Sequence, residues 1–121
     1  MSYTMREYFD SELCQDWNIF WYALGNFLDD FKRNPLEEKI SEPPEFISLE
    51  INAFLAGVAE QLSHQYQLTV PLWVYRKEYR LKEPFFPSGL KGDYRIFVLK
   101  ESPVAFKARN IFVDSDVLSR C

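Results

Sequence analysis

The stretch LCQDWNIFWYALGNFLDDF, residues 13–31, decides the fold. Its large apolar side chains recur at alternating intervals of four and three residues, which places them on one face of a helix. They are Leu13, Trp17, Phe20, Leu24, Phe27 and Phe31. The repeat is too short for the sustained heptads of a coiled coil, so it indicates a helix that packs into a core.

This helix has recognisable ends. Thr4 and Glu7 have the spacing of a capping box, and Tyr3 and Tyr8 are placed to form the hydrophobic staple around it. Pro35 stops the helix, because the residue before a proline avoids the α region. The sequence therefore predicts one long helix ahead of Pro35, although a second cap at Asp10-Ser11 would divide it into a short and a long helix.

A second long helix is predicted over residues 44–66, after a polar connection that ends in Pro43-Pro44. Its apolar stripe consists of Ile47, Ile51, Phe54, Leu55, Val58, Leu62 and Tyr66. Two long helices joined by a short link normally pack antiparallel, and we expect that arrangement here.

The remaining chain, from residue 67 on, is rich in proline and glycine and predicts short helices and loops. Ser102 as N-cap and Pro103 at the first helical position start one helix, which Asn110 ends. A final turn runs through Leu118. Residues 94–99 and 111–113 also suit short strands. The fold class is mainly α, with one domain over residues 1–121: an acidic helical pair (1–66) and a basic C-terminal unit (67–121).

Charge divides the chain at the same boundary. Residues 1–66 hold four Lys/Arg against twelve Asp/Glu, whereas residues 67–121 hold ten against six. The two halves therefore either neutralise each other within one fold or present opposite faces to different partners.

The start of the chain lacks the basic region and apolar run of a secretory signal, and no apolar run is long enough to span a membrane. A cytoplasmic location is expected. Cys14 and Cys121 lie far apart without a C-x-x-C spacing, so neither a disulfide scaffold nor a zinc site is indicated.

No catalytic constellation emerges from the sequence. His64 is the sole histidine and has no partner at a metal-ligand or catalytic spacing. The acidic pairs Asp29-Asp30 and Glu37-Glu38 are sequence neighbours, which do not face each other on a helix. We therefore expect no catalytic residue, metal or cofactor, and a protein that is not an enzyme.

Cations interleaved with aromatic residues are the candidate binding groups: Arg76, Lys77, Arg80, Lys107 and Arg109. Arginine and aromatic side chains dominate protein interfaces, and they also bind single-stranded nucleic acid. A pI near 5.0 favours another protein as the partner over nucleic acid. A homodimer is also compatible with the sequence. Arg109 has a further alternative, which is to bond carbonyl groups at the end of its own helix.

Four blocks of the C-terminal unit resemble a family of small bacterial proteins. The blocks are VPLW (70–73), LKEPFF (81–86), ESPVAFKARNIFV (101–113) and LSR (118–120), and the helix over residues 54–66 is similar as well. The family pattern reads P-x-W, E-P-W-F, S-P-x-x-F-[KR]-x-R-N-[IL]-F-V and L-x-R, and Phe85 stands where tryptophan is usual. Its structural anchors here are Trp73, Pro84, Phe85, Phe86, Ser102, Pro103, Phe106, Asn110, Phe112 and Leu118.

The resemblance implies a partner of a nucleotidyltransferase-like protein, in an arrangement similar to toxin–antitoxin operons. Some family members carry a helix-turn-helix domain ahead of these blocks, but none precedes them in this chain. The resemblance therefore implies an antitoxin-like or accessory role in protein interaction rather than DNA regulation.

Overall fold

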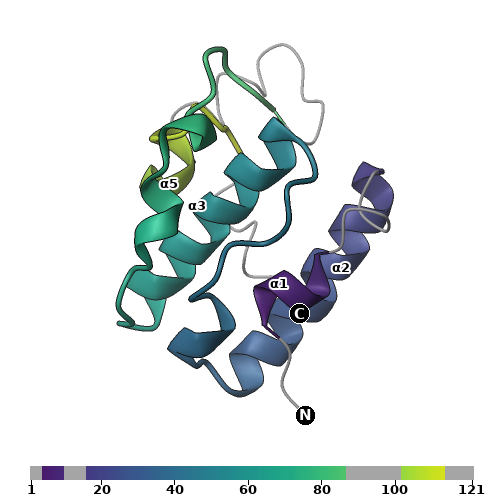
Figure 1. Cartoon of the computed structure of the whole chain (residues 1–121), viewed down its shortest axis with the longest axis vertical. Coiled ribbons are helices and arrows are strands. Elements are labelled where there is room, and N and C mark those ends of the chain that lie inside the picture. The colour runs from purple at the N-terminus through teal and green to yellow at the C-terminus, as the bar shows by residue number, and fades with distance from the viewer. Residues whose placement is uncertain (1–3, 10–15, 87–101, 114–121) are drawn as a thin grey trace.

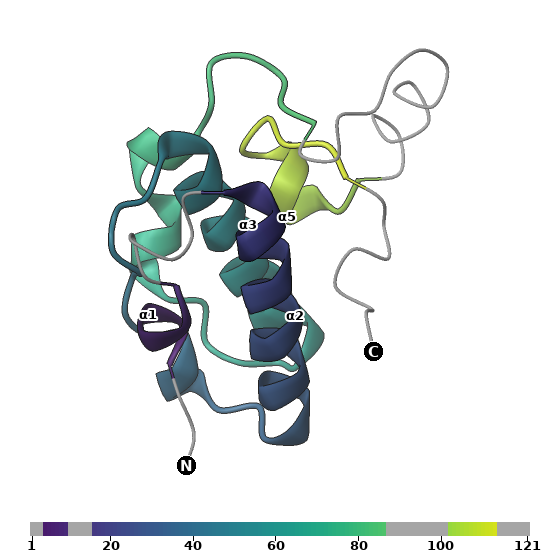
Figure 2. The same ribbon diagram turned by 90° about the vertical axis from the view of Figure 1, so that its right-hand side faces the viewer.

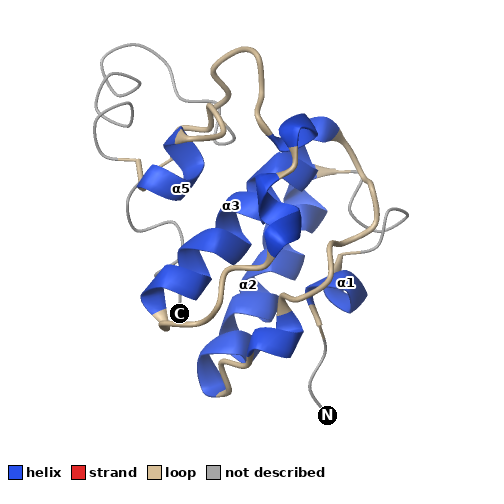
Figure 3. Ribbon diagram, turned by 60° about the vertical axis from the view of Figure 1, so that its left-hand side comes forward, coloured by secondary structure: helices blue, strands red, loops and turns tan. Residues whose placement is uncertain are grey.

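The computed structural model describes residues 4–9, 16–86 and 102–113, and over these ranges the chain is mainly helical (Figure 1). The helices are α1 (Met5–Tyr8), α2 (Trp17–Arg33), α3 (Leu49–Gln65) and α5 (Val104–Lys107), with 3-10 turns η1 (Glu37–Lys39), η2 (Leu72–Tyr75) and η3 (Lys77–Tyr79). The described ribbon contains helices and loops and no strand (Figure 3). A strand at 111–113 is reduced to an isolated parallel bridge between Phe85 and Ile111, and 94–99 lie outside the described residues.

The first helical stretch is divided. The capping box at the start of α1 is confirmed: Thr4 Oγ1 accepts from the Glu7 amide at 3.3 Å, and Glu7 Oε1 accepts from the Thr4 amide at 2.9 Å. A new helix, α2, starts at Trp17, where Asp16 Oδ1 accepts from the Asn18 amide at 2.7 Å. The continuous helix is therefore wrong and the divided alternative is right, with Asp16 as the cap. The Asp10-Ser11 cap falls outside the described residues. The end of α2, just before Pro35, is confirmed.

The predicted start of the second long helix is too early. Ser48 caps α3 by accepting from the Ile51 amide at 3.1 Å. Just inside the helix, the buried Asn52 side chain accepts from the amides of Ile47 (2.7 Å) and Ser48 (3.1 Å) and donates to the carbonyl of Glu45 at 3.0 Å. These bonds tie the preceding residues to a non-helical path, so α3 begins at Leu49 instead of Pro44.

The two long helices run in the same direction, which overturns the antiparallel prediction. Trp21, near the start of α2, lies 5.5 Å from Phe54, near the start of α3, and Phe31 lies 5.4 Å from Tyr66 at the other ends (ring centroids). Figure 1 shows both helices descending together.

The reason is the link, residues 34–48, which is not a tight turn. A 17-residue helix such as α2 is about 25 Å long, and roughly eight extended residues cover that distance. Beyond η1 the link has no regular secondary structure and carries the chain back along the helical pair (Figure 1).

The described parts of the C-terminal unit pack against α3, and α5 lies beside it in Figures 1 and 2. Phe106 of α5 is fully buried, and its ring lies 5.1 Å from the ring of Phe54. It also passes over Gly57, where an added Cβ would lie 2.6 Å from Phe106 Cδ1. The lack of a side chain at Gly57 therefore permits this approach, and the expectation that Phe106 is an inward anchor is confirmed.

Both ends of α5 differ from those predicted from the sequence. Ser102 is not an N-cap: its hydroxyl donates to the carbonyl of Val113 at 2.9 Å and accepts from its amide at 2.8 Å, and α5 begins after Pro103. Asn110 has the left-handed conformation expected of a helix stop, with φ 65°, but α5 already ends at Lys107 and Ala108 is its C-cap. The predicted final turn through Leu118 lies outside the described residues. No described helix combines the length and apolarity needed to span a membrane.

Candidate partner-binding surface

Three of the predicted cations lie together on the surface. Arg76, Lys77 and Arg80 are exposed along η2 and η3, where two aromatic side chains point the other way. Trp73 and Tyr79 are buried, with ring centroids 6.0 Å apart, and Trp73 Nε1 donates to the carbonyl of Ile40 at 2.9 Å. These interior contacts hold the turns in place, so the intervening cations face solvent.

Residues 72–82, which we call the basic segment, carry four Lys/Arg against one Glu. None of the four, Arg76, Lys77, Arg80 or Lys82, forms an ion pair within the described part of the chain. The segment also exposes apolar side chains: Leu72 is 86% exposed, and Tyr75 is about half-exposed. A large apolar side chain left in water beside unpaired cations is typical of a binding surface.

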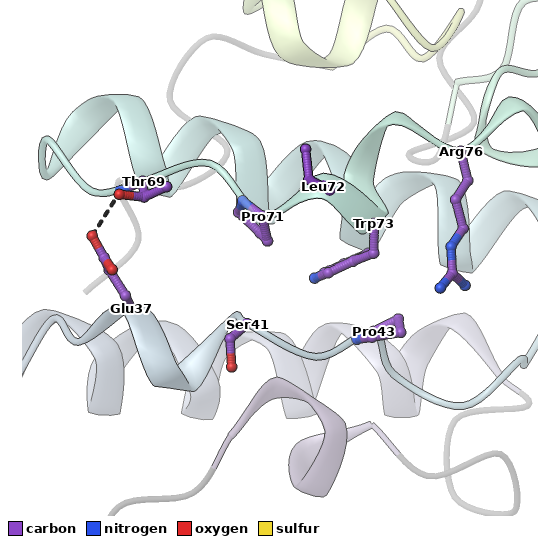
Figure 4. Close-up of a pocket in the computed structure, with 8 residues that line it drawn as sticks. All are labelled: Glu37, Ser41, Pro43, Thr69, Pro71, Leu72, Trp73 and Arg76. Carbon is purple, nitrogen blue, oxygen red and sulfur yellow. Dashed lines mark hydrogen bonds between the residues drawn. The ribbon is translucent and has the colours of Figure 1, made fainter.

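A pocket of about 420 Å³ lies beside the start of the basic segment (Figure 4). Thr69, Pro71, Leu72, Trp73 and Arg76 form one wall, and Glu37, Ser41 and Pro43 form the other. The Thr69 amide donates to Glu37 Oε1 at 2.8 Å and joins the walls at one end. The pocket therefore lies between the link and the start of the basic segment, which also meet at the bond from Trp73 Nε1 to the Ile40 carbonyl.

A second pocket, of about 600 Å³, lies beside the rest of the basic segment. Leu49 and Glu50 line it from the start of α3, and the other lining residues are Lys77, Glu78, Arg80, Leu81, Lys82, Glu83, Pro84 and Phe85. We call residues 37–50 the acidic link, because they hold five Glu and one Lys. That Lys39 is buried beside Asp30, with Nζ 3.6 Å from Oδ2. The two pockets thus lie between an acidic and a basic wall.

Arg109 occupies a different environment from the other candidates. It is 3% exposed, and its Nη1 donates to Glu60 Oε1 and to the carbonyl of Ala105, both at 2.6 Å. Its Nη2 donates to the carbonyl of Val74 at 2.7 Å. The structure therefore favours the alternative in which Arg109 bonds carbonyl groups of the fold, and it takes this side chain off the binding surface. Lys107 is exposed on α5.

Sequence reasoning missed Glu60, the carboxylate that pairs with Arg109. It also accepts from the Tyr75 hydroxyl and contacts His64 Nε2, both at 3.4 Å. Burial, followed by the Glu60 charge and hydrogen bond, raises the pKa of the Tyr75 phenol, and the Arg109 charge acts in the opposite direction. Tyr75 and Arg109 are 15 and 49 positions from Glu60, so no local pattern joins them.

The anchors expected from the family resemblance fall into three groups. Trp73, Ser102 and Phe106 are buried, whereas Phe85, Phe86, Pro103, Asn110 and Phe112 are half-buried and Pro84 is exposed. Phe85 and Ile111 form the bridge, and the Phe86 and Phe112 rings stack at 5.6 Å. Leu118 lies outside the described residues. Phe85, Phe86, Asn110 and Phe112 therefore join the segment after η3 to the segment after α5.

Within the described ranges no group of three His, Cys, Asp or Glu side chains is arranged to hold a metal ion. No family model, curated protein or solved structure matches the chain.

Proposed function

We propose that the chain is a non-enzymatic protein of the bacterial cytosol that binds another protein through its basic segment. The observation that carries the proposal is the placement of exposed Leu72 and Tyr75 beside Arg76, Lys77 and Arg80, none of which has an ion-pair partner in the described structure. Apolar contacts supply affinity at a protein interface, and charges around them supply orientation and specificity.

The specific role we propose is antitoxin-like or accessory, with a nucleotidyltransferase-like protein as the partner. This step rests on the family resemblance described above. The placement of two family-like blocks adds support: Pro71, Leu72 and Trp73 of the first block line one pocket, and Pro84 and Phe85 of the second block line the other. Residues of the family-like blocks therefore line the same two pockets as the exposed cations.

Nucleic-acid binding is the rival function, and two observations count against it. Stacking requires exposed rings, but of the two tyrosines among these cations Tyr79 is buried against Trp73 and only Tyr75 is exposed. In addition, Glu50, Glu78 and Glu83 line the same pocket as Lys77 and the neighbouring cations. Acidic side chains at that density repel a phosphate backbone.

The test measures binding to a nucleotidyltransferase-like protein encoded beside this chain, by titration calorimetry with the full chain. We expect the wild type to bind and Lys77→Glu to weaken binding by roughly tenfold or more. Arg33→Glu, at the exposed end of α2, is the matched control because it makes the same charge change elsewhere, and it should leave affinity unchanged.

Equal loss in both variants would show that only net charge matters, and no binding by the wild type would reject the proposal. Salt-dependent binding of a single-stranded oligonucleotide in its place would support the rival function.

A further inference from the structure

The acidic and basic walls lie side by side but do not neutralise each other. Glu50, Lys77 and Lys82 line the same pocket, and neither lysine forms an ion pair in the described structure. Glu60 and Arg109 form an ion pair that joins the two halves of the chain, and this pair bonds Val74 and Tyr75 of the basic segment but none of its four cations. Glu50, Lys77 and Lys82 therefore keep charges at the surface that another molecule can bind.

Each wall also exposes large apolar side chains. On the acidic link, Phe46 is 66% exposed and Leu49 is 49% exposed. On the basic segment, Leu72 is exposed. Leu49 and Leu72 each line one of the two pockets. Both walls thus combine charge with apolar surface, which is the composition of an interface rather than of an ordinary solvated face.

We propose that a second copy of this chain binds here, so that the acidic link of each copy lies against the basic segment of the other. Two adjacent stripes of opposite charge are self-complementary, because a two-fold rotation brings each stripe onto its opposite. A second copy therefore satisfies both walls at once, whereas an acidic partner would satisfy only the basic one. The pairing would bury Phe46, Leu49 and Leu72 between the copies, which favours association.

The pairing needs no other protein, so its test uses the purified full chain and is independent of the partner proposed above. Sedimentation equilibrium over micromolar to submillimolar concentrations should give twice the 14.4 kDa mass of one chain. Raising the salt concentration should weaken the dimer, because the contacts are partly ionic.

Two charge-reversed variants test the geometry. Lys77→Glu with Arg80→Glu makes both walls acidic, and Glu38→Lys with Glu42→Lys and Glu50→Lys makes both walls basic. Each variant alone should lose dimer affinity by roughly tenfold or more, because like charges then face each other. An equimolar mixture should form a heterodimer, since every acidic wall again meets a basic one. Thermal melts should show both variants folded, because all five substituted side chains are exposed.

Restoration in the mixture would support the inference, because a variant that has lost its fold cannot form the heterodimer. A wild-type monomer at every concentration would overturn the inference. A dimer that both variants retain would also overturn it, by placing the interface elsewhere, and so would a mixture that stays monomeric. The Arg33→Glu control should dimerise as the wild type does.

Discussion

Arg109 links three parts of the fold through one guanidinium group. Arg109 bonds Glu60 of α3, Ala105 of the preceding helix α5, and Val74 of η2. Arg109→Ala should therefore lower the free energy of unfolding by about 3 kcal/mol, because it leaves a carboxylate and two carbonyls without their donor. This value is near the lower end for a buried pair, since the Glu60 side chain is 14% exposed and keeps some access to water. Urea denaturation followed by circular dichroism measures the loss.

Arg76→Ala is the matched control for this substitution. It removes an exposed arginine that has no ion pair in the described structure, and it should change stability by no more than about 0.5 kcal/mol. A loss below about 1 kcal/mol for Arg109→Ala would contradict the buried position of its guanidinium.

Tyr75 gives the chain a dependence on alkaline pH. The pKa of its phenol is raised above the ordinary value of 10.0 by burial and then by Glu60, so the folded state holds the phenolic proton more tightly than the unfolded state. Stability from this group is complete below the unfolded pKa and is lost as pH rises through the folded pKa. Denaturation from about pH 8 to about pH 11 should therefore show a steeper loss for the wild type than for Tyr75→Phe. Parallel pH curves would contradict this assignment.

Local sequence signals predicted the residue roles that depend on near neighbours, and they failed where a distant residue decides the role. Thr4 and Glu7 cap α1 as their spacing implies, and Asn110 takes the left-handed conformation, although it does so two residues after the C-cap of α5. Ser102 has the sequence of an N-cap, but its hydroxyl bonds Val113, eleven positions away. Glu60 could not be identified because its partners come from later elements.

At the scale of elements, periodicity predicted both long helices but not their relative direction. An apolar stripe specifies which face of α2 or α3 is buried, and either direction of packing satisfies that requirement. The direction depends on the link. Asn52 of α3 bonds the backbone of Glu45, Ile47 and Ser48 and keeps these link residues from becoming helical. A single asparagine within an apolar run does not indicate that the residues before it are non-helical. The sequence therefore predicts a shorter link, and with it antiparallel packing.

The packing of α5 on α3 depends on the pair Gly57 and Phe106. Gly57→Ala should cost about 1–3 kcal/mol, because the new methyl group overlaps a fully buried ring, even though alanine is the better helix former. Phe106→Ala should cost about 3–5 kcal/mol through the cavity it leaves. In the Phe106→Ala background the same Gly57→Ala change should stabilise α3, by up to about 1 kcal/mol.

A double-mutant cycle measured by urea denaturation tests this reversal of sign. Additive effects of the two substitutions would show that α5 does not lie over Gly57 in solution. The cycle compares the same methyl group with and without the ring, so the helix propensity of alanine cancels.

Across the whole molecule, the uneven charge of the two halves is only partly neutralised within the fold. The Glu60–Arg109 pair joins the halves, and it lies where α3, η2 and α5 meet. The acidic link and the basic segment keep their charges at the surface on either side of two pockets. The two halves therefore neutralise each other at the Glu60–Arg109 pair and present opposite charges to solvent at the acidic link and the basic segment. The surface charges are the ones that support the proposed interactions.

The two halves should unfold as one unit despite their different composition. One cluster of buried side chains extends from Met5 through α2 and α3 to Trp73, Phe106 and Val113, so neither half keeps its core without the other. Tryptophan fluorescence can follow each half separately: Trp73→Phe leaves Trp17 and Trp21 on α2, and Trp17→Phe with Trp21→Phe leaves Trp73 on η2. In each variant the fluorescence transition in urea should coincide with the transition in far-ultraviolet circular dichroism, as two-state unfolding requires. The comparison is made within each variant, so the stability lost with a substituted tryptophan does not affect it. Separate transitions would show two independently folding units, and the C-terminal unit could then bind a partner while detached from α3.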